Sequence, residues 1–299
     1  MEYRITQEEL ANDWLYRTLI ALEKCLAAYE LPLYIVGARA RDIAMKLMGE
    51  DEPKRRTEDL DIAIAIEDWA TFNSICDTLQ SNHFKRYKET QKFFYKGEDG
   101  DIDFEVDLVP FGGIAIDEKI CWPPEGNPVM SVKCFQDVMK DAVTVNIDDK
   151  VNIKMAPICG QFLIKLDTWN DRNASTDKDA EDLLFILRKY FDIKLYKEDA
   201  VPPAVVDMND DNLDTDIWGA QWLAYDISRL LTTEHLAFYS ELIANEISKE
   251  EHSKLIYHFT KYYGGNSIDE PDFPYEQCRN IWKAFGEVLN KELEERRKQ

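Results

Sequence analysis

The most continuous hydrophobic pattern in the chain runs from Leu60 to Ile66, with Ile at alternate positions. An uninterrupted aliphatic run of this length is typical of a strand that is buried on both faces. Two aspartates, Asp59 and Asp61, stand two residues apart at its start. Side chains two apart in a strand project from the same face, so the pattern predicts that both carboxylates point to one place.

A strictly alternating pattern marks a second candidate strand, from Asp101 to Pro110. Together with the segment Lys92–Lys96 it predicts a β-hairpin that turns across Gly97–Gly100. Carboxylates aimed at one point repel one another unless a divalent cation lies between them, so a third carboxylate from this strand, beside Asp59 and Asp61, could give three acids around one metal site. The acidic face would carry Asp103, Glu105 and Asp107, and the apolar face Ile102, Phe104, Val106 and Leu108.

The segment Leu33–Val36 predicts a short strand that leads through Gly37 and Ala38 into a helix ending near Met48. At such a junction the backbone N–H groups and the helix dipole face the same point and favour an anion. The two small residues leave room for a phosphate group to approach. A strand, a small-residue turn and a helix are also a common structural connection, so the junction alone does not establish a phosphate site.

Helical periodicity accounts for most of the remaining chain. A capping box, Thr6 to Glu9, is expected to open one helix whose core face carries Leu15, Leu19 and Leu22. The sequence therefore predicts an α+β protein with a mixed sheet, flanking helices and a helical C-terminal part. Further helices are expected at 69–79, soon after 132, at 157–173, after a cap at Ser175 or Thr176, and at 217–231, 234–247, 251–263 and 275–298, with a hairpin turning at Asp148–Lys150.

The charge of the chain limits its partners. The formal net charge is −22 over 299 residues, so binding to a polyanion requires a local basic patch. One candidate is Lys54–Arg56, and the other consists of Lys85, Arg86, Lys88, Lys92 and Lys96. Acidic residues are densest in a predicted linker, at about 198–216.

Neither a targeting segment nor a metal-binding motif of cysteines and histidines stands out in the sequence. No apolar run approaches the ~20 residues that cross a bilayer, and Met1–Arg4 lacks the pattern of a signal peptide, so a cytoplasmic protein without membrane contact is expected. The six cysteines and four histidines show no metal-ligand spacing. Reduced core thiols are the expected state of these cysteines.

Three motifs in order, Gly37–Ala38, the Asp59 and Asp61 pair, and Asp107 on a later strand, resemble the DNA-polymerase-β-type nucleotidyltransferase superfamily. The likeness extends over about residues 30 to 190. Ala38 departs from the pattern, because many relatives carry Gly or Ser there and a serine would add a phosphate contact. Five segments narrow the resemblance to bacterial AbiEii-type toxins of abortive infection, and these are 107–113, 120–124, 129–132, 165–172 and 178–183.

This resemblance implies a catalytic domain at 1–156 and a helical domain at 157–299, of which 157–192 would complete the nucleotide site. Asp59, Asp61 and Asp107 would hold two Mg²⁺ or Mn²⁺ ions together with an NTP, and all three would be catalytic. Lys165 would contact the nucleotide phosphates, and Asp179 would orient Lys165 or move a proton. The remaining nucleotide-binding residues would be Gly37, Ala38, Arg39, Arg41 and Lys178.

The implied reaction transfers a nucleoside monophosphate from the NTP to an acceptor hydroxyl and releases pyrophosphate. The acceptor is either an RNA such as tRNA, which the resemblance favours, or a small molecule, for which the acidic composition suits a cation. A third interpretation is an inactive nucleotide-binding module that acts through a partner protein. An antitoxin partner is implied by the resemblance alone.

Overall fold

The computed structural model describes residues 2–49, 59–88, 91–124, 126, 129–174, 176–197, 199–202, 214–263 and 273–298. The basic triplet Lys54–Arg56, Ser175 and most of the predicted acidic linker lie outside these described residues. The chain divides into two compact units, Met1–Gln161 and Phe162–Gln299, which are described in turn.

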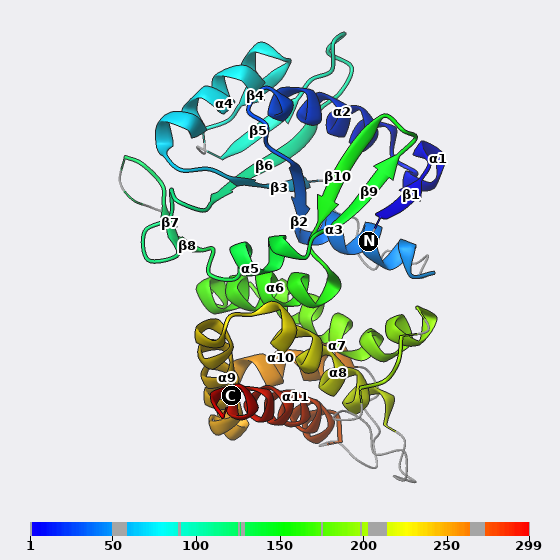
Figure 1. Cartoon of the computed structure of the whole chain (residues 1–299), viewed down its shortest axis with the longest axis vertical. Coiled ribbons are helices and arrows are strands. Elements are labelled where there is room, and N and C mark those ends of the chain that lie inside the picture. The colour runs from blue at the N-terminus through cyan, green and yellow to red at the C-terminus, as the bar shows by residue number, and fades with distance from the viewer. Residues whose placement is uncertain are drawn as a thin grey trace. The chain divides into compact units, whose positions relative to one another are not determined.

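The first unit contains an eight-stranded mixed sheet in the order β1-β9-β10-β2-β3-β6-β5-β4, and a separate pair of strands, β7 and β8 (Figure 1). The large sheet comprises β1 (Glu2–Ile5), β2 (Leu33–Val36), β3 (Asp59–Ala65), β4 (Phe84–Arg86), β5 (Lys92–Tyr95), β6 (Phe104–Phe111), β9 (Val143–Ile147) and β10 (Val151–Met155). The small pair comprises β7 (Lys119–Cys121) and β8 (Val129–Ser131).

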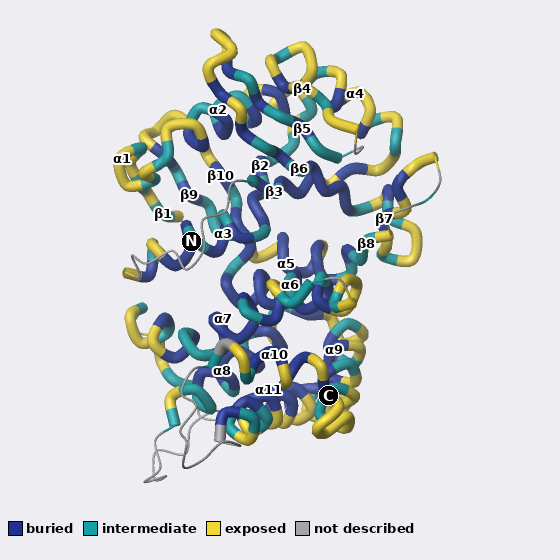
Figure 2. The backbone as a smooth tube through the Cα atoms, turned by 180° about the vertical axis from the view of Figure 1, so that it is seen from behind, coloured by how far each residue is buried: buried dark blue, intermediate teal, exposed yellow. Residues whose placement is uncertain are grey.

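The aliphatic strand β3 lies near the middle of the sheet, antiparallel to β2 and parallel to β6. Leu60, Ile62 and Ile64 have no exposed surface, and the central strands are buried in Figure 2. Ala63 is also buried, so the middle of the strand is covered on both faces as its composition predicts. Burial of each large aliphatic side chain contributes about 1.5–3 kcal/mol, which holds this strand firmly in register.

In the described part of this unit, five helices accompany the sheet. Two of them, α2 and α4, pack against each other and against strands of the sheet (Figure 1). Their apolar faces, with Leu19 and Leu22 from α2 and Phe72 and Ile75 from α4, meet the buried side chains of the strands. The five are α1 (Gln7–Leu10), α2 (Asp13–Ala27), α3 (Gly37–Leu47), α4 (Trp69–Ser81) and α5 (Phe135–Lys140).

The second unit is helical. α6 (Ile158–Arg172) starts in the first unit and continues into the second, where the aromatic rings of Phe162, Trp282 and Phe285 pack together. Among the described residues, no helix is both long and apolar enough to span a bilayer. The other helices are α7 (Lys178–Tyr196), α8 (Thr215–Leu230), α9 (Thr233–Ser248), α10 (Lys254–Tyr263) and α11 (Phe273–Arg297), with a 3₁₀ turn at Glu250–His252.

The predicted fold class, a mixed sheet with flanking helices followed by a helical region, is confirmed. Some local predictions are wrong. The first helix is two helices, because Ala11 takes a left-handed conformation and Asn12 caps a new start. The cap of α7 is Asp177, although the hydroxyl of Thr176 does accept a bond from the amide of Lys178.

Candidate functional site

Four carboxylates lie on one face of two neighbouring strands. In the parallel register of β3 and β6, Asp59 is opposite Glu105 and Asp61 is opposite Asp107. Residues paired in this way project from the same face, and residues two apart along each strand do so as well. Each of the four residues is partly exposed, while their neighbours Leu60 and Val106 are fully buried on the other face. Asp103 precedes β6 and pairs with Lys96, so it is not part of this set.

The spacing of this acidic face is set by sheet geometry. Neighbouring strands lie about 4.8 Å apart, and residues two apart along a strand are separated by about 6.6 Å. Two unit charges about 5 Å apart repel by about 3 kcal/mol at an effective dielectric constant of about 20. A set of four carboxylates on this scale therefore requires compensating positive charge.

Lys92 of β5 supplies part of that charge. It is paired with Asp107 in the antiparallel register of β5 and β6, so it projects from the acidic face. Its ammonium group forms a salt bridge with Glu105 and lies 3.8 Å from Oδ2 of Asp107. Lys92 thus occupies the side of the cluster away from Asp59 and Asp61.

The Gly37 turn approaches the same carboxylates from β2. Val36, the last residue of β2, is opposite Asp61, and Gly37 follows with φ of 70° as the first residue of α3. A Cβ atom at Gly37 would lie 2.0 Å from Oδ2 of Asp61, so the close approach requires glycine at this position. Val36 has no side-chain oxygen with which to cap α3, and the first amides of the helix start next to the carboxylate of Asp61.

The two arginines that follow are held by the protein. Arg41 is 5% exposed, and its guanidinium donates to Oδ1 of Asp42 from Nε at 3.1 Å and from one terminal nitrogen at 2.7 Å. The guanidinium carbon of Arg39 lies 5.8 Å from the centre of the Phe104 ring. Both residues lie in the first turns of α3, while their contact with phosphate stays a prediction.

The donor set suits a hard divalent cation, because Mg²⁺ and Mn²⁺ prefer carboxylate oxygens. Asp59, Asp61 and Asp107 provide three such groups on one face. Within the described part of the chain, however, no three acidic, histidine or cysteine residues already converge as closely as bound metal requires. The residues fit the ions in type and share one face of the sheet, and their side chains would have to rotate to complete the coordination.

Two predicted residues of the second unit, Lys165 and Asp179, belong to an ionic cluster around a buried carboxylate. Nζ of Lys165 on α6 lies 3.2 Å from Asp179 and 2.8 Å from Asp182 on α7. Arg172 donates to both carboxylate oxygens of the fully buried Asp179, at 2.8 and 2.9 Å. Burial pushes the pKa of Asp179 up, but the hydrogen bonds and charges of Arg172 and Lys165 prevail and hold it below its ordinary value.

Lys165 and Asp179 are therefore in direct contact, and Lys178 is an exposed residue at the start of α7. The described contacts of Asp179 orient Lys165 and Arg172 together. The action of Lys165, Asp179 and Lys178 on a nucleotide stays a prediction.

Sequence reasoning missed two members of the acidic face. The alternation along β6 placed Glu105 beside Asp107, but Glu105 was not among the candidate site residues. Lys92 was assigned to a basic patch, whereas it neutralises Glu105 and approaches Asp107. The register of the hairpin, in which Lys92 opposes Asp107, is the signal that identifies it.

Comparison with known proteins gives little further information. No protein-family model and no curated protein matches the chain. A solved structure from H. pylori, described as a "putative nucleotidyltransferase", aligns over 95% of this chain and 97% of its own with 11% identity and a TM-score of 0.32. A likeness at this level determines neither the fold nor the activity of this chain.

Proposed function

We propose that the protein is a metal-dependent nucleotidyltransferase that moves a nucleoside monophosphate from an NTP to an acceptor hydroxyl, with pyrophosphate as the other product. The observation that carries the proposal is the meeting of Asp61, Asp107 and Gly37. Two carboxylates from neighbouring strands stand side by side, and the start of α3 reaches one of them.

Each part of this arrangement has a role in the proposed reaction. Asp59, Asp61 and Asp107 would hold two divalent ions, which supply Lewis-acid stabilisation of the phosphate charge. The amides after Gly37 and the positive end of the α3 dipole would bind phosphate oxygens of the NTP. Asp107 would also accept the proton of the acceptor hydroxyl. A role of Lys165 and Asp179 toward the nucleotide is a proposal that rests on the sequence resemblance alone.

The test incubates the full chain with each of four α-labelled NTPs and Mg²⁺ or Mn²⁺, with total cellular RNA and a panel of cationic small molecules as acceptors. We expect Asp59→Ala and Asp61→Ala to abolish label transfer, with little loss of stability because the changes relieve repulsion. Asp77→Ala, an exposed aspartate on α4, serves as the matched control and should transfer normally. Equal transfer by wild type and the Asp59 variant would refute the assignment.

The second candidate is a nucleotide-binding module without transfer activity that acts through a partner protein. The salt bridge between Lys92 and Glu105, next to Asp107, favours it because a protein cation already offsets part of the acidic charge. Saturable NTP binding without label transfer, unaffected by Asp107→Asn, would support this candidate. A toxic role and an antitoxin partner are proposals that rest only on the sequence resemblance.

A further inference from the structure

The acidic face continues across β5 and β4 as a surface of lysine and aromatic side chains. Lys85 is opposite Phe94 in the register of β4 and β5, and the amide of Tyr87 donates to the carbonyl of Lys92 at 2.9 Å. Because paired residues share a face, Lys85, Tyr87 and Phe94 project from the same side of the sheet as Lys92. Since Lys92 is opposite Asp107, this is also the side of the candidate metal ligands.

The aromatic rings of this surface are accessible. Tyr87 is 53% exposed, and its ring contacts that of Phe94 edge to face at a centroid distance of 5.6 Å. The ammonium of Lys96 lies 5.4 Å from the centre of the Phe94 ring. A half-exposed tyrosine that is fixed by a second ring offers a flat platform to a planar partner at low entropic cost.

The charges of the surface favour an anion. Lys85 is exposed and forms no ion pair within the part of the chain that the structure describes. Lys96 is paired with Asp103 at 2.6 Å, so it contributes less positive charge to this surface. On a chain of net charge −22, an exposed lysine beside an exposed tyrosine forms a local exception that would repel a cationic acceptor.

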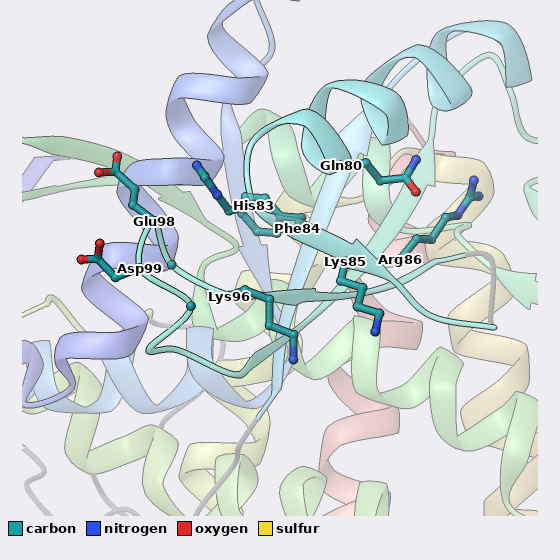
Figure 3. Close-up of a pocket in the computed structure, with 10 residues that line it drawn as sticks. Gln80, His83, Phe84, Lys85, Arg86, Lys96, Glu98 and Asp99 are labelled. Carbon is teal, nitrogen blue, oxygen red and sulfur yellow. The ribbon is translucent and has the colours of Figure 1, made fainter.

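The surface ends at a pocket of about 770 Å³ between β4 and the turn that joins β5 to β6. Lys85 and Lys96 project from neighbouring strands to the same side, and Arg86 projects to the other (Figure 3). Glu98 and Asp99 in the turn make this pocket mixed in charge. Within this region the acidic side chains thus lie in the turn, and the exposed Lys85 lies on the strand face opposite Phe94.

We propose that the strand face of Lys85, Tyr87 and Phe94 binds the free end of a single-stranded polynucleotide as the acceptor. This inference rests on the proposed function and selects one acceptor class for it. From β6 to β4 the sheet spans about 10 Å, which matches roughly three stacked nucleotides at about 3.4 Å each. Tyr87 and Phe94 would stack on bases, Lys85 would contact a phosphate, and the terminal hydroxyl would lie toward Asp107.

Fluorescence anisotropy of labelled 12-nucleotide RNA and DNA strands, each titrated with the full chain at several salt concentrations, tests the surface without requiring catalysis. Tyr87→Ala should weaken binding at least about fivefold, while Tyr87→Phe, which keeps the stacking face, should bind like wild type. Lys85→Ala should weaken binding and reduce the slope of log K against log salt by about 0.7. Lys150→Ala, at an exposed turn distant in the sheet order, is the charge-matched control and should change neither.

Comparison of the RNA and DNA strands then shows which polynucleotide the surface accepts. Undetectable binding of both strands, or equal affinity of wild type, Tyr87→Ala and Lys85→Ala, would overturn the inference. The label-transfer assay is read separately. Transfer only to small molecules contradicts the acceptor surface and leaves the proposed activity intact, whereas strand binding without any transfer supports the surface and contradicts the activity.

Discussion

Replacement of Gly37 by alanine tests the contact between the α3 turn and the acidic face. Gly37 has φ of 70°, a conformation that costs an L-residue about 1–2 kcal/mol. The new Cβ would also lie 2.0 Å from Oδ2 and 2.9 Å from Cγ of Asp61. Because ordinary contacts between carbon atoms are about 3.5–4 Å, the carboxylate would have to move by about 1 Å or more.

Gly126→Ala separates these two effects. Gly126 has φ of 76°, and a Cβ atom added there would meet no atom of the described residues within 4 Å, so the substitution carries only the conformational cost. Urea unfolding should show a loss of about 1–2 kcal/mol for Gly126→Ala and at least as much for Gly37→Ala. Nucleotidyl transfer should be normal in Gly126→Ala and reduced about 100-fold or more in Gly37→Ala, because a displacement of about 1 Å can cost that factor.

The transfer rate of Gly37→Ala is the decisive value. A rate within about twofold of wild type would show that the position of the Asp61 carboxylate is immaterial, and the proposed role of the turn would be wrong. A loss of transfer equal in the Gly37 and Gly126 variants would instead trace the effect to global destabilisation.

Three further predictions concern stability and reactivity. Asp179→Asn should lower the free energy of unfolding by about 3–5 kcal/mol at pH 7, since it breaks a buried ionic cluster. The folded-state pKa of Asp179 lies below the ordinary 3.8, so the stability that its carboxylate contributes is present above that pH and is lost as the pH falls. The difference in unfolding free energy between wild type and Asp179→Asn, measured by urea titration, should therefore shrink below about pH 4. Gly219→Ala should lower the melting temperature, because its Cβ would lie 2.9 Å from the Leu187 carbonyl oxygen, where α7 packs against α8. The steric cost of about 1–3 kcal/mol exceeds the gain of about 1 kcal/mol in helix propensity. Cys121 is exposed while the other cysteines are buried, and burial raises the pKa of Cys76 to about 11 and that of Cys278 to about 12. A thiol reagent should therefore label Cys121 rapidly in the wild type and label no site rapidly in Cys121→Ser.

The strands at the centre of the sheet could be predicted from the sequence because their patterns are local. The Ile repeat of β3 and the alternation in β6 both specify which side chains are buried. The edge strands could not be predicted in the same way. β1 pairs in parallel with β9, more than 130 residues later, and its stability depends on that distant partner. β4 has only three residues and gives no periodic signal of its own.

In the candidate site too, local spacing could be predicted from the sequence, whereas contacts that depend on strand register could not. The placement of Asp59 and Asp61 on one face follows from two-residue spacing, but the alignment of Asp61 with Asp107 depends on the register between β3 and β6. The contact of Gly37 with Asp61 depends on the antiparallel register of β2, which carries the turn to that carboxylate. The split helix at Ala11 shows the converse, since the capping box at Thr6 opens a helix that ends at Ala11, whose left-handed backbone the sequence does not show, and the leucine face belongs to the next helix.

The most direct test of the central claim is a crystal structure of the full chain with Mn²⁺ and a non-hydrolysable NTP, in which anomalous scattering locates the ions. We expect ions bound by Asp59, Asp61 and Asp107, with the triphosphate against the amides that follow Gly37. Ions and nucleotide bound elsewhere, with Lys92 still bridging Glu105 and Asp107, would contradict the claim.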